Sequence, residues 1–183
     1  MLRTRALAAG LALAVGMGAA TAALGPAVYA SAGVPAATGS FRSWHAAQQA
    51  AGFRLRHPTR RHGLTRSGKI VVARCMVTGR LSKRQVFAAY GQASHRFLEL
   101  VQNNSGAACG DPGEAKQLGI FRIHGARGTL FGICGAVGLP SCHKRHITLF
   151  LTWRKHHIFY QAFSHNERRH TLLNFARSLK PVS

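Results

Sequence analysis

The stretch that decides the fold is ITLFLTWRKHHIFYQAF, residues Ile147–Phe163. Apolar residues occupy every second position of its first half: Ile147, Leu149, Leu151 and Trp153. A period of two places these residues on one side of a strand. The polar centre, Arg154–His157, has the length of a tight turn. The stretch therefore predicts two antiparallel strands joined by a hairpin, with one side of the first strand buried.

Other segments of the chain have the same strand-like character and are separated by turn residues. They are Ile70–Val77, Gln85–Tyr90, Arg96–Gln102, Leu118–Ile123 and Thr129–Cys134, in addition to Ile147–Trp153 and Ile158–Phe163. Neighbouring strands with short connections form antiparallel sheets. We therefore expect one antiparallel sheet of six to seven strands.

A helix is predicted at each end of this run of strands. Ser43 is a suitable N-cap for a helix over Trp44–Ala51, and Gly52 is placed to end it. Near the C-terminus, Ser164–Glu167 has the S-x-x-E pattern of a capping box, which predicts a helix that ends at Lys180-Pro181. The predicted fold class is α+β, with an N-terminal and a C-terminal helix packed on one face of the sheet.

The first thirty residues have the parts of a secretory signal. Arg3 and Arg5 precede an apolar run of small residues, and cleavage is expected after Ala30 or Ala32. The alternative is an uncleaved N-terminal signal anchor, because the run is long enough to span a bilayer. The predicted division is a signal peptide over 1–30, a linker over 31–42 and a single secreted domain over 43–183.

Four cysteines follow the signal, and an even number in an oxidising compartment predicts two disulfides with three possible pairings. We favour Cys75–Cys109 with Cys134–Cys142, because the turn GAVGLPS lies between the last two. The alternative is a zinc site made by Cys134, Cys142, His143 and His146. Its spacing matches no standard ligand pattern, so we expect no metal and no cofactor.

The chain is strongly basic, with 25 Lys and Arg residues against four acids and a formal charge of +21. Removal of the signal with Arg3 and Arg5 lowers this charge to +19. For an exported monomer, the expected partners are anionic wall polymers, lipid head groups or an acidic protein, rather than a specific nucleic acid. A basic surface without a function is the alternative. The candidate anion-binding residues are Arg54, Arg56, Arg60, Arg61, Lys144, Arg145, Arg154 and Lys155.

The shortage of acids also argues against catalysis. A glycosidase needs two placed carboxylates, and the only aspartate, Asp111, lies in a C-G-D-P-G turn. We therefore expect a binding protein that is not an enzyme. The alternative hypothesis is a small secreted ribonuclease-like hydrolase, in which His143–His146 and Lys155–His157 supply His/Lys pairs.

Several short motifs resemble a domain of unknown function that occurs in the extracytoplasmic halves of bacterial transmembrane anti-sigma factors and in exported lipoproteins. These motifs are AAQQAAGFRLRHPT (46–59), Val86–Tyr90, Phe97–Gln102, Ile123–Gly128 and the ending LFLTWRKHHIFYQAF…LLNFARSL. The resemblance covers most of residues 44–180 and implies sensing or binding at the cell surface, with no catalytic residues to carry over. Only five residues precede the apolar run, so we expect no sigma-binding portion.

Overall fold

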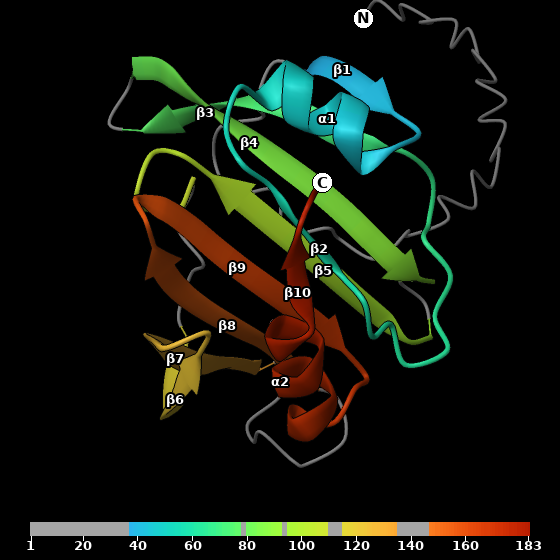
Figure 1. The fold of residues 1–183 in the computed structure, drawn as a ribbon. Helices are drawn as coiled ribbons and strands as arrows, with labels where there is room; N and C mark the ends of the chain where they lie inside the picture. Colours follow the sequence, from blue (N-terminus) through green and yellow to red (C-terminus); the bar gives the residue numbers. More distant parts are fainter. Residues whose placement is uncertain (1–36, 78–79, 93–94, 110–114, 135–146) are drawn as a thin grey trace, which may run out of the picture.

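A computed structural model describes residues 37–77, 80–92, 95–109, 115–134 and 147–183 (Figure 1). Its main feature is an eight-stranded sheet in which every neighbouring pair is antiparallel. In spatial order its strands are β1 (Ala37–Phe41), β3 (Ile70–Val77), β4 (Arg80–Gly91), β5 (Phe97–Asn103), β9 (Ile158–His165), β8 (Ile147–Lys155), β7 (Ala126–Cys134) and β6 (Lys116–Ile123).

The remaining elements cover one face of this sheet. They are helix α1 (Trp44–Ala51), helix α2 (Arg169–Arg177) and a two-stranded sheet of β2 (Arg56–Pro58) and β10 (Leu179–Pro181). Figure 1 shows α1 over β3 and β4, and α2 over the part of the sheet that contains β8 and β9. The short β2–β10 sheet lies between the two helices. All the covering elements therefore lie on the same side.

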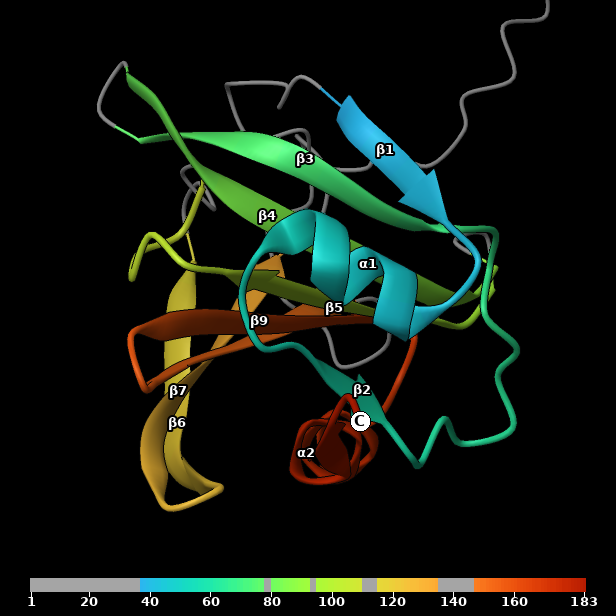
Figure 2. The same ribbon diagram turned by 45° about the horizontal axis from the view of Figure 1, so that its top comes forward.

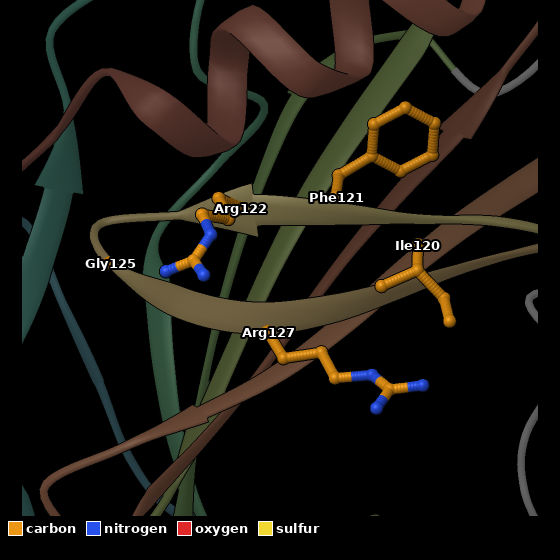
Figure 3. Close-up of a pocket in the computed structure, with 5 residues that line it drawn as sticks. All are labelled: Ile120, Phe121, Arg122, Gly125 and Arg127. Carbon is orange, nitrogen blue, oxygen red and sulfur yellow. The ribbon is translucent and has the colours of Figure 1, made fainter.

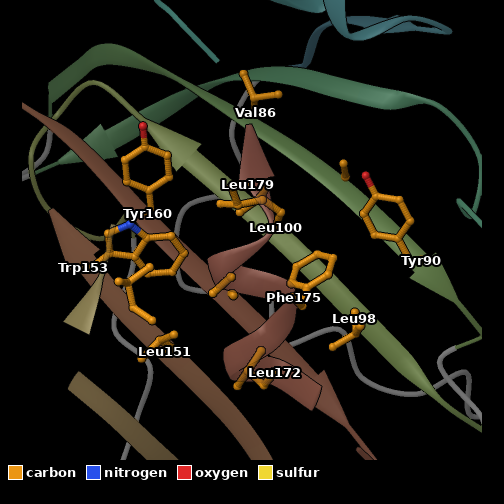
Figure 4. Close-up of a cluster of buried hydrophobic side chains, with 14 of the residues drawn as sticks. Val86, Tyr90, Leu98, Leu100, Leu151, Trp153, Tyr160, Leu172, Phe175 and Leu179 are labelled. Carbon is orange, nitrogen blue, oxygen red and sulfur yellow. The ribbon is translucent and has the colours of Figure 1, made fainter. Parts of the chain in front are cut away.

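The hydrophobic core fills the space between the sheet and this cover. Figure 4 shows its centre, where Phe175 of α2 lies among leucines of the sheet and of α2 itself. Phe175 is fully buried, and its ring meets the ring of Tyr90 edge-on at 5.6 Å between centroids. Trp153 and Tyr160 stack in the same core at 5.1 Å. The alternation predicted for residues 147–153 is confirmed, because Leu149, Leu151 and Trp153 all belong to this core.

The opposite face of the sheet carries a row of side chains across four adjacent strands. Glu99, Phe163, Phe150 and Phe131 are successive cross-strand partners on β5, β9, β8 and β7. The rings of Phe131 and Phe150 stack at 4.9 Å, and Phe150 and Phe163 are 5.8 Å apart. Phe150 is buried. This face is therefore apolar too, with one carboxyl at the end of an aromatic row.

The predicted fold class was wrong in its proportions. The described residues form ten strands and only two short helices, instead of an α+β fold with six to seven strands. All seven predicted strands are present, each within two residues of its predicted start except β4, which begins at Arg80 instead of Gln85, and β7, which begins at Ala126 instead of Thr129. Of the three further strands, β1 and β10 were not predicted. Strand β2 begins at Arg56, where the alternation of Phe53 and Leu55 with arginines predicts a short strand stopped by His57-Pro58. All three are only three to five residues long, and segments as short as ATGSF, RHP and LKP carry little strand signal.

The two helices differ in how well their ends were predicted. For α1 both caps are confirmed: the Ser43 Oγ accepts from the Ala46 N–H at 3.2 Å, and Gly52 adopts φ 71° and donates to the Gln48 carbonyl. For α2 the capping box is wrong. Ser164 is a buried residue of β9, and the helix starts at Arg169 with Arg168 as an N-cap that makes no side-chain bond.

Glu167 explains why the capping box fails. Its carboxylate accepts a charge-assisted hydrogen bond from Arg96 Nε at 2.7 Å, at the start of β5. A carboxylate engaged by a guanidinium is not available to a helix N-terminus. Glu167 therefore links the segment after β9 to the residue that precedes β5. The helix also ends earlier than predicted, because Leu179 and Lys180 form β10 with β2.

The eight-stranded sheet is strongly twisted, as Figure 2 shows. In that view β3, β4, β5 and β9 run nearly across the picture, whereas the β6–β7 hairpin stands almost upright. A right-handed twist of about 20–25° for each pair of neighbouring strands accumulates to this rotation. The twist turns β6, at one edge of the sheet, toward α2.

Several predictions fall on residues outside the described ranges. The signal over 1–30 lies outside them, whereas β1 begins at Ala37 inside the predicted linker. Only one of the four cysteine side chains, that of Cys109, is described, so the two predicted disulfides are not confirmed. Cys109 itself is disulfide-bonded, but the side chains of the other three cysteines are not described. Within the described ranges no helix is long and apolar enough to span a membrane.

Candidate anion-binding site

The site is built on the extended segment Arg54-Leu55-Arg56, which leads into β2. Because side chains alternate along an extended chain, Leu55 points into the core and is 1% exposed, whereas Arg54 is exposed and Arg56 is half-buried. The backbone of Leu55 is held at both ends: its N–H donates to the Gln48 side chain at 2.8 Å, and its carbonyl accepts from the Val182 N–H at 3.0 Å. The two arginines therefore project from a fixed backbone.

This segment forms one wall of a groove of about 470 Å³. The other side of the groove is formed by the β8–β9 turn, the start of β9 and the end of β10. We call it the Arg54 groove, and its lining residues are Arg54, Leu55, Arg56, His156, Ile158, Tyr160 and Pro181. The lining contains two guanidinium groups, an imidazole and a phenol, and no carboxylate.

Gln102 fixes the position of Arg56. This side chain is fully buried on β5, opposite Tyr160 on β9. Its Nε2 donates to the Arg56 carbonyl and its Oε1 accepts from the Arg56 N–H, both at 2.8 Å. The Arg56 Nη1 also donates to the Leu179 carbonyl at 3.1 Å. Such a clamp lowers the entropy lost when the guanidinium binds a ligand.

Tyr160 forms the polar floor of the groove. Burial raises the pKa of its phenol, while the charge of Arg56 and a hydrogen bond with it act in the opposite direction. The stacked Trp153 holds the Tyr160 ring in the core. The phenol is therefore protonated at neutral pH and stands beside a fixed guanidinium. A neutral O–H donor beside a cation is suited to an anionic oxygen.

More positive charge lies beside the groove. The Lys155 Nζ donates to the His124 carbonyl at 2.6 Å, which holds the ammonium next to the β6–β7 turn. Burial lowers the pKa of His124, although a hydrogen bond to the Ala176 carbonyl opposes the decrease. The charges of Arg56 and Lys155 lower the pKa further. Both cations therefore act on one imidazole, which places Lys155 and Arg56 in the same electrostatic neighbourhood.

The β8–β9 turn places His156 at the mouth of the groove. His156 and His157 have φ values of 49° and 63°, the left-handed pair of a type I′ turn. The predicted hairpin is thus confirmed, with its two central residues at positions 156 and 157. His156 is exposed and lines the groove.

The structure brings together only part of the predicted set of cations. Arg54 and Arg56 line the groove, and Lys155 lies next to it. Arg154 points away, because its guanidinium donates to the Gly106 carbonyl after β5. Lys144 and Arg145 lie outside the described ranges.

Arg60 and Arg61 belong to the loop that follows β2 and do not line the groove. The Arg60 N–H donates to Ser178 Oγ at 3.1 Å. Arg61 lies near Tyr90. Burial raises the pKa of the Tyr90 phenol to about 12, although the charges of Arg61 and Arg66 oppose this increase. Figure 4 shows Tyr90 and Tyr160 on opposite sides of the core.

A second hollow of about 490 Å³ lies at the β6–β7 hairpin (Figure 3). It is lined by Ile120, Phe121, Arg122, Gly125 and Arg127. This surface was not predicted from the sequence, where Ile120 and Phe121 belong to the predicted strand Leu118–Ile123. In the Arg54 groove, Tyr160, Ile158 and Pro181 were not predicted either. The alternation of arginines around Leu55 was the one signal for that groove, since it places both guanidinium groups on one side of the chain.

Comparisons with known proteins give no family for this chain: no family model matches it, and no curated protein or solved structure is significantly similar to it. The resemblance to the extracytoplasmic domain of anti-sigma factors therefore stays a prediction. Within the described ranges no group of three or more His, Cys, Asp or Glu residues could hold a metal ion. The zinc alternative involves residues outside those ranges. The chemistry of the site rests on the cations and the phenol.

Proposed function

We propose that this protein is an exported binding domain, not an enzyme, which binds anionic groups of a cell-envelope polymer in the Arg54 groove. The observation that supports this proposal most directly is the Gln102 clamp, which fixes Arg56 next to a protonated Tyr160. The two hydrogen bonds of this buried glutamine fix the backbone from which the Arg56 side chain projects. The groove lining contains no carboxylate that would compete for the guanidinium groups.

The charge of the chain fits this function. With a formal charge of +21 the protein is attracted to any polyanion, and that attraction weakens with salt because bound counterions are released. General attraction alone would depend on the total charge and not on particular arginines. A groove with fixed donors adds a local component that depends on Arg54 and Arg56. Separating these two components is the purpose of the test.

The test is a titration of the protein with fluorescent long-chain polyphosphate between 20 and 200 mM NaCl. The double variant Arg54→Gln/Arg56→Gln is expected to bind roughly tenfold more weakly for each arginine, the lower end of what a charge-assisted hydrogen bond contributes. Its plot of log affinity against log salt should be shallower by about one for each phosphate that the variant no longer neutralises. Arg54→Gln alone is the cleanest single variant, because Arg54 makes no hydrogen bond to the described part of the protein.

The matched control is Arg74→Gln/Arg177→Gln, which removes the same charge from exposed positions outside the groove. It is expected to bind within about twofold of the unsubstituted protein, because exposed charges contribute weakly and are screened. Equal losses of affinity in the two double variants would show that the groove arginines act only through the total charge, which would contradict the proposal.

Two further probes separate the possible sources of the anion, and a third tests the hydrolase alternative. Vesicles of phosphatidylglycerol and a polyglutamate chain replace the polyphosphate in parallel titrations, and we expect the binding of polyphosphate to depend most on Arg54.

In the test of the hydrolase alternative, RNA is incubated with the protein between pH 4 and 9 and is expected to stay intact. RNA cleavage that His156→Ala abolishes would replace binding with hydrolysis as the function of this groove.

A further inference from the structure

The β6 strand is a free edge of the eight-stranded sheet. In the strand order it has only β7 as a neighbour, and nothing in the described ranges pairs with its outer side. Its eight residues contain no proline, whereas β1, at the other edge, has five residues. A long edge strand without proline presents backbone N–H and C=O groups that can pair with another chain.

The tight turn between β6 and β7 determines which residues of β6 face outward. Ile123 and Ala126 flank the two-residue turn His124-Gly125 and therefore form a hydrogen-bonded pair. Because such pairs alternate along an antiparallel ladder, the next bonded pair is Phe121–Gly128. The intervening residues Arg122 and Ile120 then direct their N–H and C=O groups away from β7, toward the free edge.

The same edge carries the two exposed large apolar side chains of the described residues. Leu118 is 39% exposed and Ile120 is 46% exposed. In Figure 3, Phe121 projects toward α2, whereas Ile120 and Arg127 project from the other side of the hairpin. Leu118 lies at a bulge in the pairing with β7, so the regular part of the edge runs from Gly119 to Ile123.

The surroundings of this edge are positively charged. Lys116, Arg122 and Arg127 are exposed on the hairpin, and the Arg169 guanidinium lies 5.0 Å from the centre of the Phe121 ring. Only two acids lie in the described ranges: Glu167 is bonded to Arg96, and Glu99 belongs to the aromatic row on β5. Neither lines the hollow at the hairpin. The edge thus combines open backbone groups, two apolar side chains and several cations.

We propose that the β6 edge binds an extended acidic segment of a partner protein, which adds to the sheet as a further strand. Backbone hydrogen bonds from Ile120 and Arg122 supply affinity, and apolar residues at alternate positions of the segment contact Ile120 and Leu118. A carboxylate at the next position on that same face of the segment pairs with Arg122 and Arg127, because both arginines share a face with Ile120. A second copy of this chain is disfavoured, because it would bring the same cations opposite one another.

This site shares no residue with the Arg54 groove, so either can fail without the other. The probe is a fluorescent twelve-residue peptide, VTVTET repeated twice, which carries its valines and glutamates on one face. It is titrated at 150 mM NaCl to screen general attraction. Ile120→Pro removes one outward N–H without removing a bond to β7 and is expected to weaken binding more than tenfold. Ile120→Ser keeps the N–H and removes the apolar contact, with an expected loss of about threefold to tenfold. Arg54→Gln is expected to bind the peptide like the unsubstituted protein.

A matched peptide tests the backbone without changing the protein. The same sequence, N-methylated at every second residue on its pairing side, keeps all charges and is expected to bind more than tenfold more weakly; this comparison stands even if Ile120→Pro does not fold. Equal binding of the methylated peptide, or equal competition by polyglutamate, would show that charge alone acts and overturn the proposal. A dimer in sedimentation that Ile120→Pro abolishes would overturn it as well, by assigning the edge to a second copy.

Discussion

Replacing Glu99 with glutamine is expected to stabilise the protein at pH 8 by about 3 kcal/mol and to have almost no effect at pH 4. Glu99 lies at the end of the aromatic row on the outer face of the sheet, between Ala89 and Phe163 on the neighbouring strands. Burial in these surroundings raises the pKa of its carboxyl from about 4.5 to about 7. Glutamine has nearly the same shape and carries no charge at any pH.

The sign follows from proton linkage. A carboxyl with a pKa of about 7 in the folded state and about 4.5 in the unfolded state binds protons more tightly when folded. The stabilising effect of that proton is complete below pH 4.5 and disappears as the pH rises through 7. Above pH 7 the folded protein holds a poorly solvated carboxylate. Glutamine removes this cost, so its advantage appears only at high pH.

Urea unfolding of the two proteins at pH 4 and pH 8 measures the effect directly. The control is Glu167→Gln, which breaks the ion pair between a 53% exposed Arg96 and a 4% exposed Glu167 side chain. It is expected to destabilise the protein at pH 8 by about 1–2 kcal/mol, the opposite sign to Glu99→Gln. An equal change in the free energy of unfolding at both pH values would show that Glu99 does not titrate in this way.

Truncating Phe175 to alanine is expected to destabilise the protein by about 3–5 kcal/mol. Phe175 is fully buried on α2, and its edge-on contact with Tyr90 lies at the centre of the core. Alanine would remove that contact and leave a cavity between α2 and the sheet, which the rigid strands close only in part. A decrease of this size is a large fraction of the stability of a domain of this length.

The measurement is again the free energy of unfolding in urea, with His170→Ala as the control. His170 is an exposed residue of the same helix, and its truncation is expected to change the stability by no more than about 0.5 kcal/mol. Similar small effects in both variants would mean that α2 is not packed on the sheet at Phe175.

The parts of the fold that sequence patterns predicted are those with a strong local cause. Residues 147–163 alternate over a hairpin, and Ser43 and Gly52 mark both ends of α1, so these elements were predicted correctly. Strand β10 has no such cause, because it has only three residues and pairs with β2, which lies more than 120 residues earlier in the sequence. Glu167 was misassigned because its partner, Arg96, is 71 residues away in the sequence.

The candidate site was predictable to a smaller extent. Arg54 and Arg56 were both predicted as anion-binding residues, and the structure places both in one groove. Nothing in the sequence indicated that Gln102, 46 residues away, holds the Arg56 backbone or that Tyr160 forms the floor. The predicted cations Arg154, Arg60 and Arg61 do not line the groove. A run of basic residues in the sequence does not determine which surface of the fold each side chain occupies.

The central claim is that an anionic group occupies the Arg54 groove, and an NMR titration of the ¹⁵N-labelled protein with tripolyphosphate tests it most directly. We expect the amide signals of Leu55, Arg56 and His156 to shift in a saturable way at 50 mM NaCl, and Arg54→Gln to remove most of that shift. Signals that move equally at arginines all over the surface, with no saturation at the groove, would contradict the claim.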